Sequence, residues 1–97
     1  MKKVFDGKIY DTDKATKKAE WEHLTPDSPY YCKDNVYVTS KNNWFLHSFQ
    51  HSSADGTTYE VIETINPLNK EQMFEWLYNR NFADLIELYF SDMIEEA

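Results

Sequence analysis

Short apolar runs paired across turn residues commit the first half of the chain to antiparallel sheet. The pair Asp6-Gly7 stands between the runs Val4-Phe5 and Ile9-Tyr10. Both residues of the pair tolerate the positive φ angles that a two-residue hairpin turn requires. The chain therefore begins as strand, tight turn and strand.

A second hairpin is expected from Asn35–Ser40 and Trp44–Gln50, two runs rich in β-branched and aromatic residues. Lys41-Asn42-Asn43 between them readily enters the left-handed conformation of a turn. The length of this turn decides which residues share a face of the sheet. A two-residue turn groups Val36, Val38, Phe45, Phe49 and His47. A three-residue turn groups Val36, Val38, Trp44 and Leu46.

The segment between the two hairpins is expected to be helical at first and then irregular. Asp11 or Thr12 can cap a helix that runs through Glu22 and has a thin apolar stripe. That helix would pack at the edge of the sheet through Ala15, Ala19 and Trp21. Two prolines follow, and Tyr30–Asn35 is predicted to be a loop that leads into the next strand.

After the second hairpin, the pattern changes from strand to helix. Ser52–Thr57 is predicted to be a polar loop, and Tyr59–Ile65 alternates as a strand that Pro67 ends. The residue pair Asn69 and Gln72 then matches a capping box.

Two helices are predicted in the last third of the chain. The first follows the capping box and extends to about Asn79, and Asn81 can cap the second. The second has a wide apolar stripe at helical spacing. Its members are Phe82, Leu85, Ile86, Tyr89, Phe90, Met93 and Ile94.

Length and composition indicate one small domain. With 97 residues, 41% of them hydrophobic, residues 1–97 can form a single modest core. The predicted class is α+β, with a small antiparallel sheet from the two hairpins and a further strand, flanked by one N-terminal and two C-terminal helices. We expect a cytoplasmic protein without a membrane partner, because no segment resembles a signal peptide or a membrane span. The single cysteine, Cys32, is expected to be a free thiol.

Motifs for catalysis and for cofactor or metal binding are missing from the sequence. Glycine occurs only at positions 7 and 56, which excludes the phosphate-binding loops and the esterase nucleophile motif. His47 and His51 are four residues apart on a predicted strand, a separation of about 13 Å that is too long for one metal ion. We therefore expect no enzyme activity, no cofactor and no metal.

The charge of the chain is uneven. The net charge is −7, but residues 1–50 carry +1 and residues 51–97 carry −8. The main lysine cluster, Lys14, Lys17 and Lys18, is diluted by acidic neighbours, so direct nucleic-acid binding is not expected. An acidic surface favours basic protein partners, and it also favours solubility.

Two sets of residues are candidates for binding a protein partner. The first is a row of carboxylates at helical spacing: Glu71, Glu75, Asp84 and Glu87. Like charges one turn apart cost about 0.2–0.5 kcal/mol per pair, so either solubility or a basic partner favours them. The second is an aromatic patch near Tyr37, Trp44 and Phe49.

The order of three segments resembles a known family. Gly7–Ala15 fits the pattern Gly-Lys-x-Tyr-Asp-Thr-x-x-Ala, Tyr37–Leu46 is a similar hairpin, and Ile65–Leu68 leads to an acidic helix. The chain thereby resembles small proteins of phages and mobile elements of Gram-positive bacteria, although Asn42 replaces the usual glycine of the hairpin. Some members are anti-CRISPR inhibitors of type II Cas nucleases, and no catalytic residues come with this resemblance.

This resemblance implies inhibition of a type II Cas effector nuclease in the bacterial host by stoichiometric protein–protein binding. The alternative is a phage or plasmid accessory protein that binds another host protein.

Overall fold

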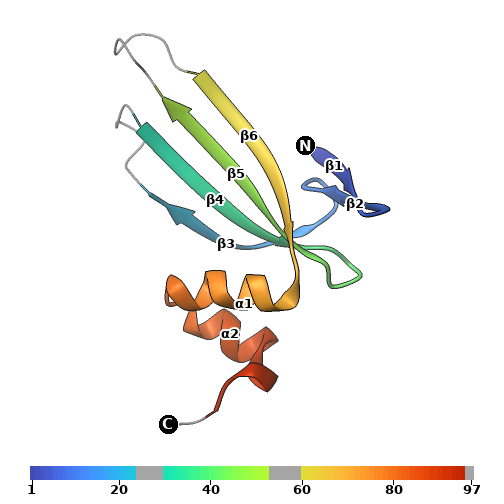
Figure 1. The fold of residues 1–97 in the computed structure, drawn as a ribbon, viewed down its shortest axis with the longest axis vertical. Coiled ribbons are helices and arrows are strands. Elements are labelled where there is room, and N and C mark those ends of the chain that lie inside the picture. Colours follow the sequence, from blue (N-terminus) through green and yellow to red (C-terminus); the bar gives the residue numbers. More distant parts are fainter. Residues whose placement is uncertain (24–29, 53–59, 96–97) are drawn as a thin grey trace. The chain divides into compact units, whose positions relative to one another are not determined.

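The structure is a computed structural model that describes residues 1–23, 30–52 and 60–95. It is an α+β protein with two antiparallel sheets, of two and four strands, and two α-helices (Figure 1). The contacts divide the chain into two compact units, Met1–Pro67 and Leu68–Ala97. We call them the sheet unit and the helical unit.

The first hairpin has the predicted turn. Strand β1 (Lys2–Phe5) pairs with β2 (Lys8–Asp11), and Phe5 is opposite Lys8. Asp6 and Gly7 have φ angles of 51° and 72°, as a two-residue turn requires.

The prediction that both hairpins join one sheet is wrong, because β1 and β2 form a sheet of their own. The chain turns away directly after β2, where the Asp11 carbonyl accepts hydrogen bonds from the amides of Lys14 and Ala15 at 3.2 and 3.0 Å. This turn ends the pairing of β2 before the next strand begins.

The larger sheet is a meander of four strands in the order β3-β4-β5-β6 (Figure 1). The strands are β3 (Thr16–Glu22), β4 (Tyr30–Val38), β5 (Trp44–Ser52) and β6 (Glu60–Leu68). Consecutive strands of a meander need only short connections, which suits a chain of this length.

Two predictions in this region are wrong: the helix through Glu22 and the loop Tyr30–Asn35. Both segments are strands that pair with each other, with Glu20 opposite Asn35 and Glu22 opposite Lys33. The weak alanine stripe could not stabilise a helix by packing, whereas the strand ladder satisfies the backbone groups of both segments. The pairing could not be predicted from the hydrophobic periodicity of either segment alone.

The second hairpin has the three-residue turn. The Thr39 amide donates to the Asn43 carbonyl at 2.9 Å, and Asn42 adopts a φ angle of 63°. Val36 is therefore opposite Leu46, and Val38 is opposite Trp44. These four buried residues share one face of the sheet, which we call the valine face.

The opposite face carries the second group of buried side chains in the sheet unit. Phe45 packs there with Tyr10 of β2 and Ile65 of β6. The Tyr10 and Phe45 rings meet edge to face at 5.5 Å, and Lys3 Nζ donates to the Ile65 carbonyl at 3.3 Å. These contacts fix the small N-terminal sheet against the larger one.

The strand predicted at Tyr59–Ile65 is confirmed, but it is longer than predicted. Pro67 lies inside β6 rather than ending it. A proline is compatible with this strand because β6 is at the edge of the sheet. Most of the predicted polar loop, residues 53–57, and Tyr59 itself lie outside the described residues.

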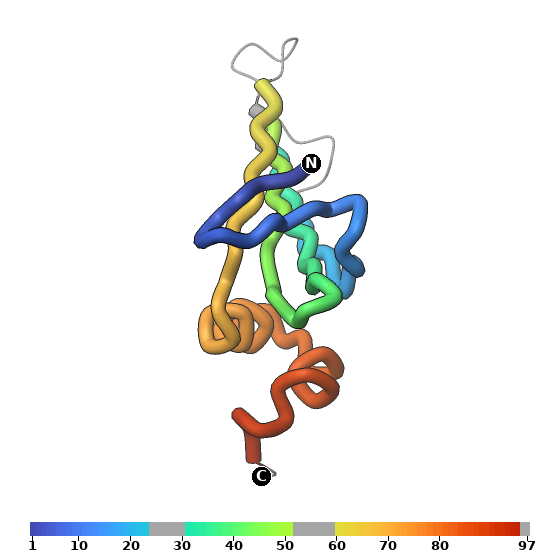
Figure 2. The backbone as a smooth tube through the Cα atoms, turned by 90° about the vertical axis from the view of Figure 1, so that its right-hand side faces the viewer, coloured from blue at the N-terminus to red at the C-terminus, as the bar shows by residue number. Residues whose placement is uncertain are grey.

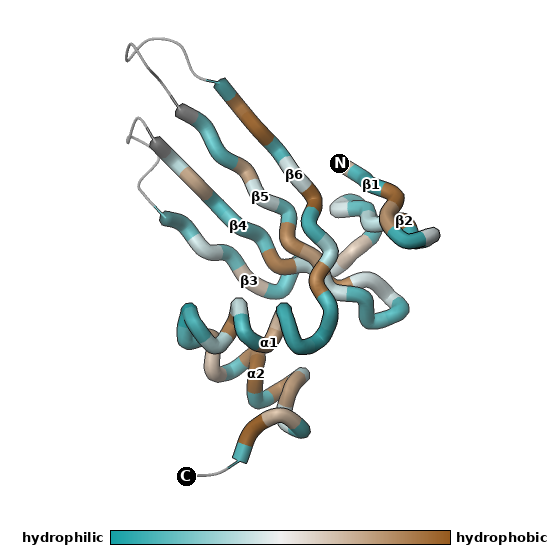
Figure 3. The backbone as a smooth tube through the Cα atoms, in the orientation of Figure 1, coloured by the Kyte–Doolittle hydropathy of each residue, from teal (hydrophilic) through white to brown (hydrophobic). Residues whose placement is uncertain are grey.

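The helical unit begins with the predicted capping box. Helix α1 spans Lys70–Asn79, the Asn69 side chain accepts from the Gln72 amide at 2.8 Å, and the Gln72 side chain accepts from the Asn69 amide at 2.9 Å. Hydrophobic and hydrophilic residues alternate along the helix (Figure 3), and its buried residues are Met73, Trp76 and Leu77.

The second helix is shorter than predicted and starts one residue later. Helix α2 spans Ala83–Tyr89 with Phe82 at its N-cap, followed by the 3-10 turn η1 (Ser91–Met93). Asn81 is not the cap, because it adopts the left-handed conformation with φ 59°. The predicted apolar stripe is therefore interrupted: Ile86 and Phe90 are buried, whereas Tyr89 and Ile94 are exposed.

Candidate protein-binding site

The four candidate carboxylates are exposed on the two helices. Glu71 and Glu75 are one turn apart on α1, on the side opposite its buried residues. Asp84 and Glu87 are exposed on α2, where Ile86 is buried. The helix geometry therefore turns all four predicted residues toward solvent.

Ion pairing does not neutralise these carboxylates. The helical unit contains 2 basic and 7 acidic residues. Lys70 Nζ binds the carboxylate of Asp92 at 2.5 Å and thereby lowers the pKa of Asp92. Arg80 lies 4.2 Å from the centre of the Trp76 ring, and its Nη1 donates to the Trp76 carbonyl. Within the described part of the chain, none of the four carboxylates has a cationic partner.

A groove of about 560 Å³ lies inside the helical unit, and Glu87 is the one candidate carboxylate among its lining residues. Its apolar walls include Tyr78, Ile86 and Ile94, and the carboxylates of Glu87 and Glu95 also line it. Tyr78 is 67% exposed. An arginine or lysine side chain combines an apolar stem with a cationic head, so this lining is complementary to it.

An exposed apolar residue lies near Asp84 on α2. Leu88 is 69% exposed and lies one helical turn after Asp84. A protein interface typically combines such apolar contacts with a charged rim. We call Glu71, Glu75, Asp84, Glu87 and the groove lined by Glu87 the acidic surface.

The predicted aromatic patch is not one surface. Tyr37 and Phe49 lie on the face of the sheet opposite the valine face, whereas Trp44 belongs to the valine face and is only 8% exposed. The physical reason is the alternation of side chains along a strand: Trp44 and Phe49 are five residues apart on β5, so they point to opposite faces whatever the length of the turn. Tyr37 is stacked on Phe45 with ring centres 5.2 Å apart.

The sequence interpretation missed a cluster of aromatic and imidazole rings on that second face. Tyr31 lies 5.1 Å from His51 and 6.2 Å from Phe49, measured between ring centres. Tyr31 was assigned to a predicted loop. Polar and apolar residues do not alternate over Tyr31–Tyr37, so the local sequence contains no strand signal that could have placed it on this face.

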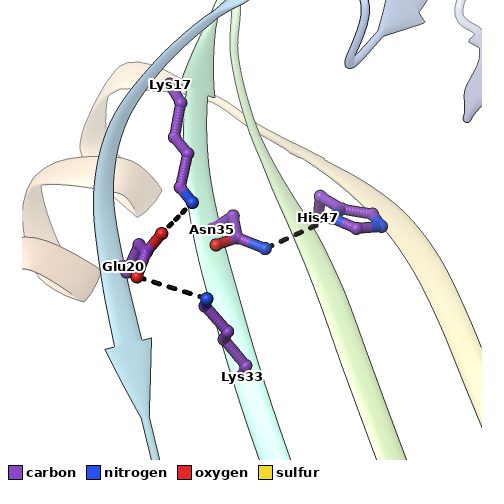
Figure 4. Close-up of polar contacts among 5 residues, drawn as sticks. All are labelled: Lys17, Glu20, Lys33, Asn35 and His47. Carbon is purple, nitrogen blue, oxygen red and sulfur yellow. Dashed lines mark hydrogen bonds and ion pairs between the residues drawn. The ribbon is translucent and has the colours of Figure 1, made fainter.

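Polar side chains form a row on the second face (Figure 4). The Glu20 carboxylate binds Lys17, and it binds Lys33 at 3.2 Å. The hydrogen bond from Lys17, followed by that from Lys33, lowers the pKa of Glu20, and the same carboxylate raises the pKa of Lys33. This network stabilises charged forms, which does not suit a general acid or base.

Asn35 and His47 form the buried part of this polar row (Figure 4). Asn35 Nδ2 lies 3.3 Å from His47 Nδ1. Asn35 Oδ1 and His47 Nε2 are buried and have no hydrogen-bond partner among the described residues. The pair joins β4 to β5 through a single side-chain contact.

The described residues contain no group of three or more His, Cys, Asp or Glu side chains that could hold a metal ion. Cys32 is a free thiol whose Sγ is 3.9 Å from Gln50 Oε1. Neither helix in the described part of the chain is long and apolar enough to cross a membrane.

Comparison with known proteins gives no relative: no protein-family model, no curated protein and no solved structure matches the chain.

Proposed function

We propose that this protein is an anti-CRISPR inhibitor that binds a type II Cas effector nuclease in the bacterial cytoplasm. It inhibits by occupying a basic surface of the nuclease in a stoichiometric complex, without chemistry of its own. The sequence resemblance suggests this class of partner. The observation that carries the binding mode is the exposure of Glu71, Glu75, Asp84 and Glu87, which have no cationic partner among the residues that the structure describes.

The acidic surface suits a nucleic-acid-binding partner. Such proteins carry lysine and arginine side chains that neutralise phosphates, and an array of carboxylates competes for the same cations. The groove lined by Glu87 and Glu95 adds a place for the stem and head of one basic side chain. Electrostatic attraction speeds association, and the apolar contacts of Tyr78 and Leu88 slow dissociation.

The decisive experiment is a titration of plasmid cleavage by purified type II nucleases. We expect cleavage to fall linearly with added protein and to stop near one equivalent, because a tight complex removes one nuclease per inhibitor. Size-exclusion chromatography should then show a one-to-one complex. If none of the nucleases forms a complex and cleavage continues at a large excess, the protein is not such an inhibitor. Recovery of a different host protein would support the accessory-protein alternative.

A further inference from the structure

A pocket of about 430 Å³ lies in the sheet unit, away from the acidic surface in sequence and composition. One side is formed by β2 and the segment after it, and the other by the turn between β4 and β5. Figure 2 shows these parts, with the N-terminal hairpin in blue and the turn in green. The volume is in the range of small-molecule sites.

Three of the ten residues that line this pocket are lysines. Lys8, Lys14 and Lys41 all contribute to it, although the chain as a whole has a net charge of −7. None of the three forms an ion pair with a described residue. The lining contains one acid, Asp11, whose Oδ1 already accepts from the Asp13 amide at 2.9 Å. The pocket therefore has an excess of positive charge.

Three tight turns hold the lysines in place. The turn at Asp6-Gly7 sets Lys8 at the start of β2, and the carbonyl of Asp11 binds the Lys14 amide. The turn that contains Lys41 is closed by the hydrogen bond from the Asn42 amide to the Thr39 carbonyl at 3.0 Å. Backbone ordered in this way lowers the entropy cost of binding a ligand.

Hydroxyl groups add directional donors to the lysines. Thr39 and Ser40 both line the pocket. Thr39 Oγ1 accepts from the Asn43 amide at 3.1 Å, which leaves its hydroxyl hydrogen to donate to another acceptor. Ammonium and hydroxyl donors together match the oxygens of a phosphoryl group.

We propose that this lysine pocket binds a small phosphorylated molecule, of the size of pyrophosphate or a nucleoside diphosphate, through its phosphoryl oxygens. A long nucleic acid is a poorer ligand because its backbone would extend over acidic neighbours such as Asp6 and Asp13. The inference is independent of nuclease inhibition, since it rests on the sheet unit alone.

The test is a titration of the isotope-labelled full chain with pyrophosphate, and separately with ADP, followed by amide NMR at about 50 mM salt. We expect shifts confined to residues 7–15 and 39–43, with saturation. If neither compound at millimolar concentration shifts these amides, the proposal is wrong. It is also wrong if a single-stranded oligonucleotide binds more tightly than both, with affinity that rises with its length.

Matched variants test the role of the lysines. Lys8→Gln, Lys14→Gln and Lys41→Gln together should weaken binding by about tenfold or more, because three charge-assisted contacts are lost. The control combines Lys2→Gln, Lys33→Gln and Lys70→Gln, which changes the net charge equally outside the pocket. Thermal melts verify that both variants are folded. Equal loss of affinity in the two variants would show non-specific charge attraction and overturn the proposal.

Discussion

At the scale of single residues, Asn35 and His47 show how a buried polar contact between β4 and β5 affects folding. Each has a buried polar atom without a hydrogen-bond partner among the described residues, and their mutual contact is 3.3 Å long. A buried polar group that loses its partner costs about 1–3 kcal/mol, whereas replacing both groups by apolar ones is nearly neutral. The pair therefore contributes more to pairing specificity than to stability.

This predicts a strong coupling between two substitutions. His47→Leu alone should lower the free energy of unfolding by about 1–3 kcal/mol, because Asn35 loses its partner in the buried part of the face. Asn35→Leu together with His47→Leu should recover most of that loss. Urea denaturation measures both values. If His47→Leu alone leaves the free energy of unfolding unchanged, or if adding Asn35→Leu lowers it further, the pair is not coupled.

The Glu20 carboxylate predicts a dependence of stability on pH. Hydrogen bonds from Lys17, and then from Lys33, lower the pKa of Glu20 in the folded state. A lowered pKa means that the stabilisation is complete above the pKa of the unfolded chain and is lost as the pH falls through the folded pKa. Glu20→Gln should therefore flatten the acid side of the plot of melting temperature against pH.

The matched control for this prediction is Glu63→Gln, because Glu63 is exposed on β6 and makes no ion pair among the described residues. Melting temperatures between neutral pH and the folded pKa of Glu20 compare the two variants. Equal slopes would mean that the interaction of Glu20 with the two lysines adds nothing to folding.

At the scale of elements, the capping signal of a helix could be predicted from neighbouring residues, whereas the pairing of strands that are far apart in the sequence could not. Helix α1 was predicted with its end at Asn79 because the capping box at Asn69 is contained in four consecutive residues. Strand β3 was predicted as a helix because its partner β4 begins only after the intervening prolines. The helical spacing of the acidic row could be predicted from local sequence as α1 was, whereas the strand position of Tyr31 could not, because β4 was not predicted over its first residues.

Two positions at the C-terminal end of α2 should differ sharply in their contribution to stability: Leu88 in the last turn and Phe90 at the C-cap. Phe90 is 1% exposed, and the centre of its ring lies 6.3 Å from the centre of the Phe74 ring within the helical unit. Phe90→Ala should lower the free energy of unfolding by about 3–5 kcal/mol. Leu88→Ala, at an exposed position, should change it by less than about 0.5 kcal/mol. Similar losses in chemical denaturation would contradict the packing of this element.

At the scale of the whole molecule, charge is divided between the units. The helical unit has a net charge of −5 and the sheet unit −2, from 10 acidic and 8 basic residues. This division could be read from the sequence because charge counts do not depend on the fold. The exposure of the carboxylates and the groove beside Glu87 required the structure, since helix boundaries decide which side chains face solvent.

An acidic surface that binds a basic partner predicts a steep dependence on salt. Raising the salt concentration from about 0.05 to about 0.5 M shortens the Debye length from about 14 to about 4 Å. The association rate with the nuclease should fall by about tenfold or more, with a smaller change in the dissociation rate. Stopped-flow fluorescence follows both rates. A salt-independent association rate would indicate binding through an apolar surface instead.

The most direct test compares two charge-reversed variants in one plasmid cleavage assay. The first carries Glu71→Lys, Glu75→Lys, Asp84→Lys and Glu87→Lys. The control carries Asp13→Lys, Glu22→Lys, Glu60→Lys and Glu63→Lys, four exposed positions of the sheet unit with the same total change in charge. The acidic surface predicts that the first variant remains folded and loses inhibition by at least about tenfold, while the control still inhibits near one equivalent. Inhibition at the wild-type concentration by the folded first variant would contradict it.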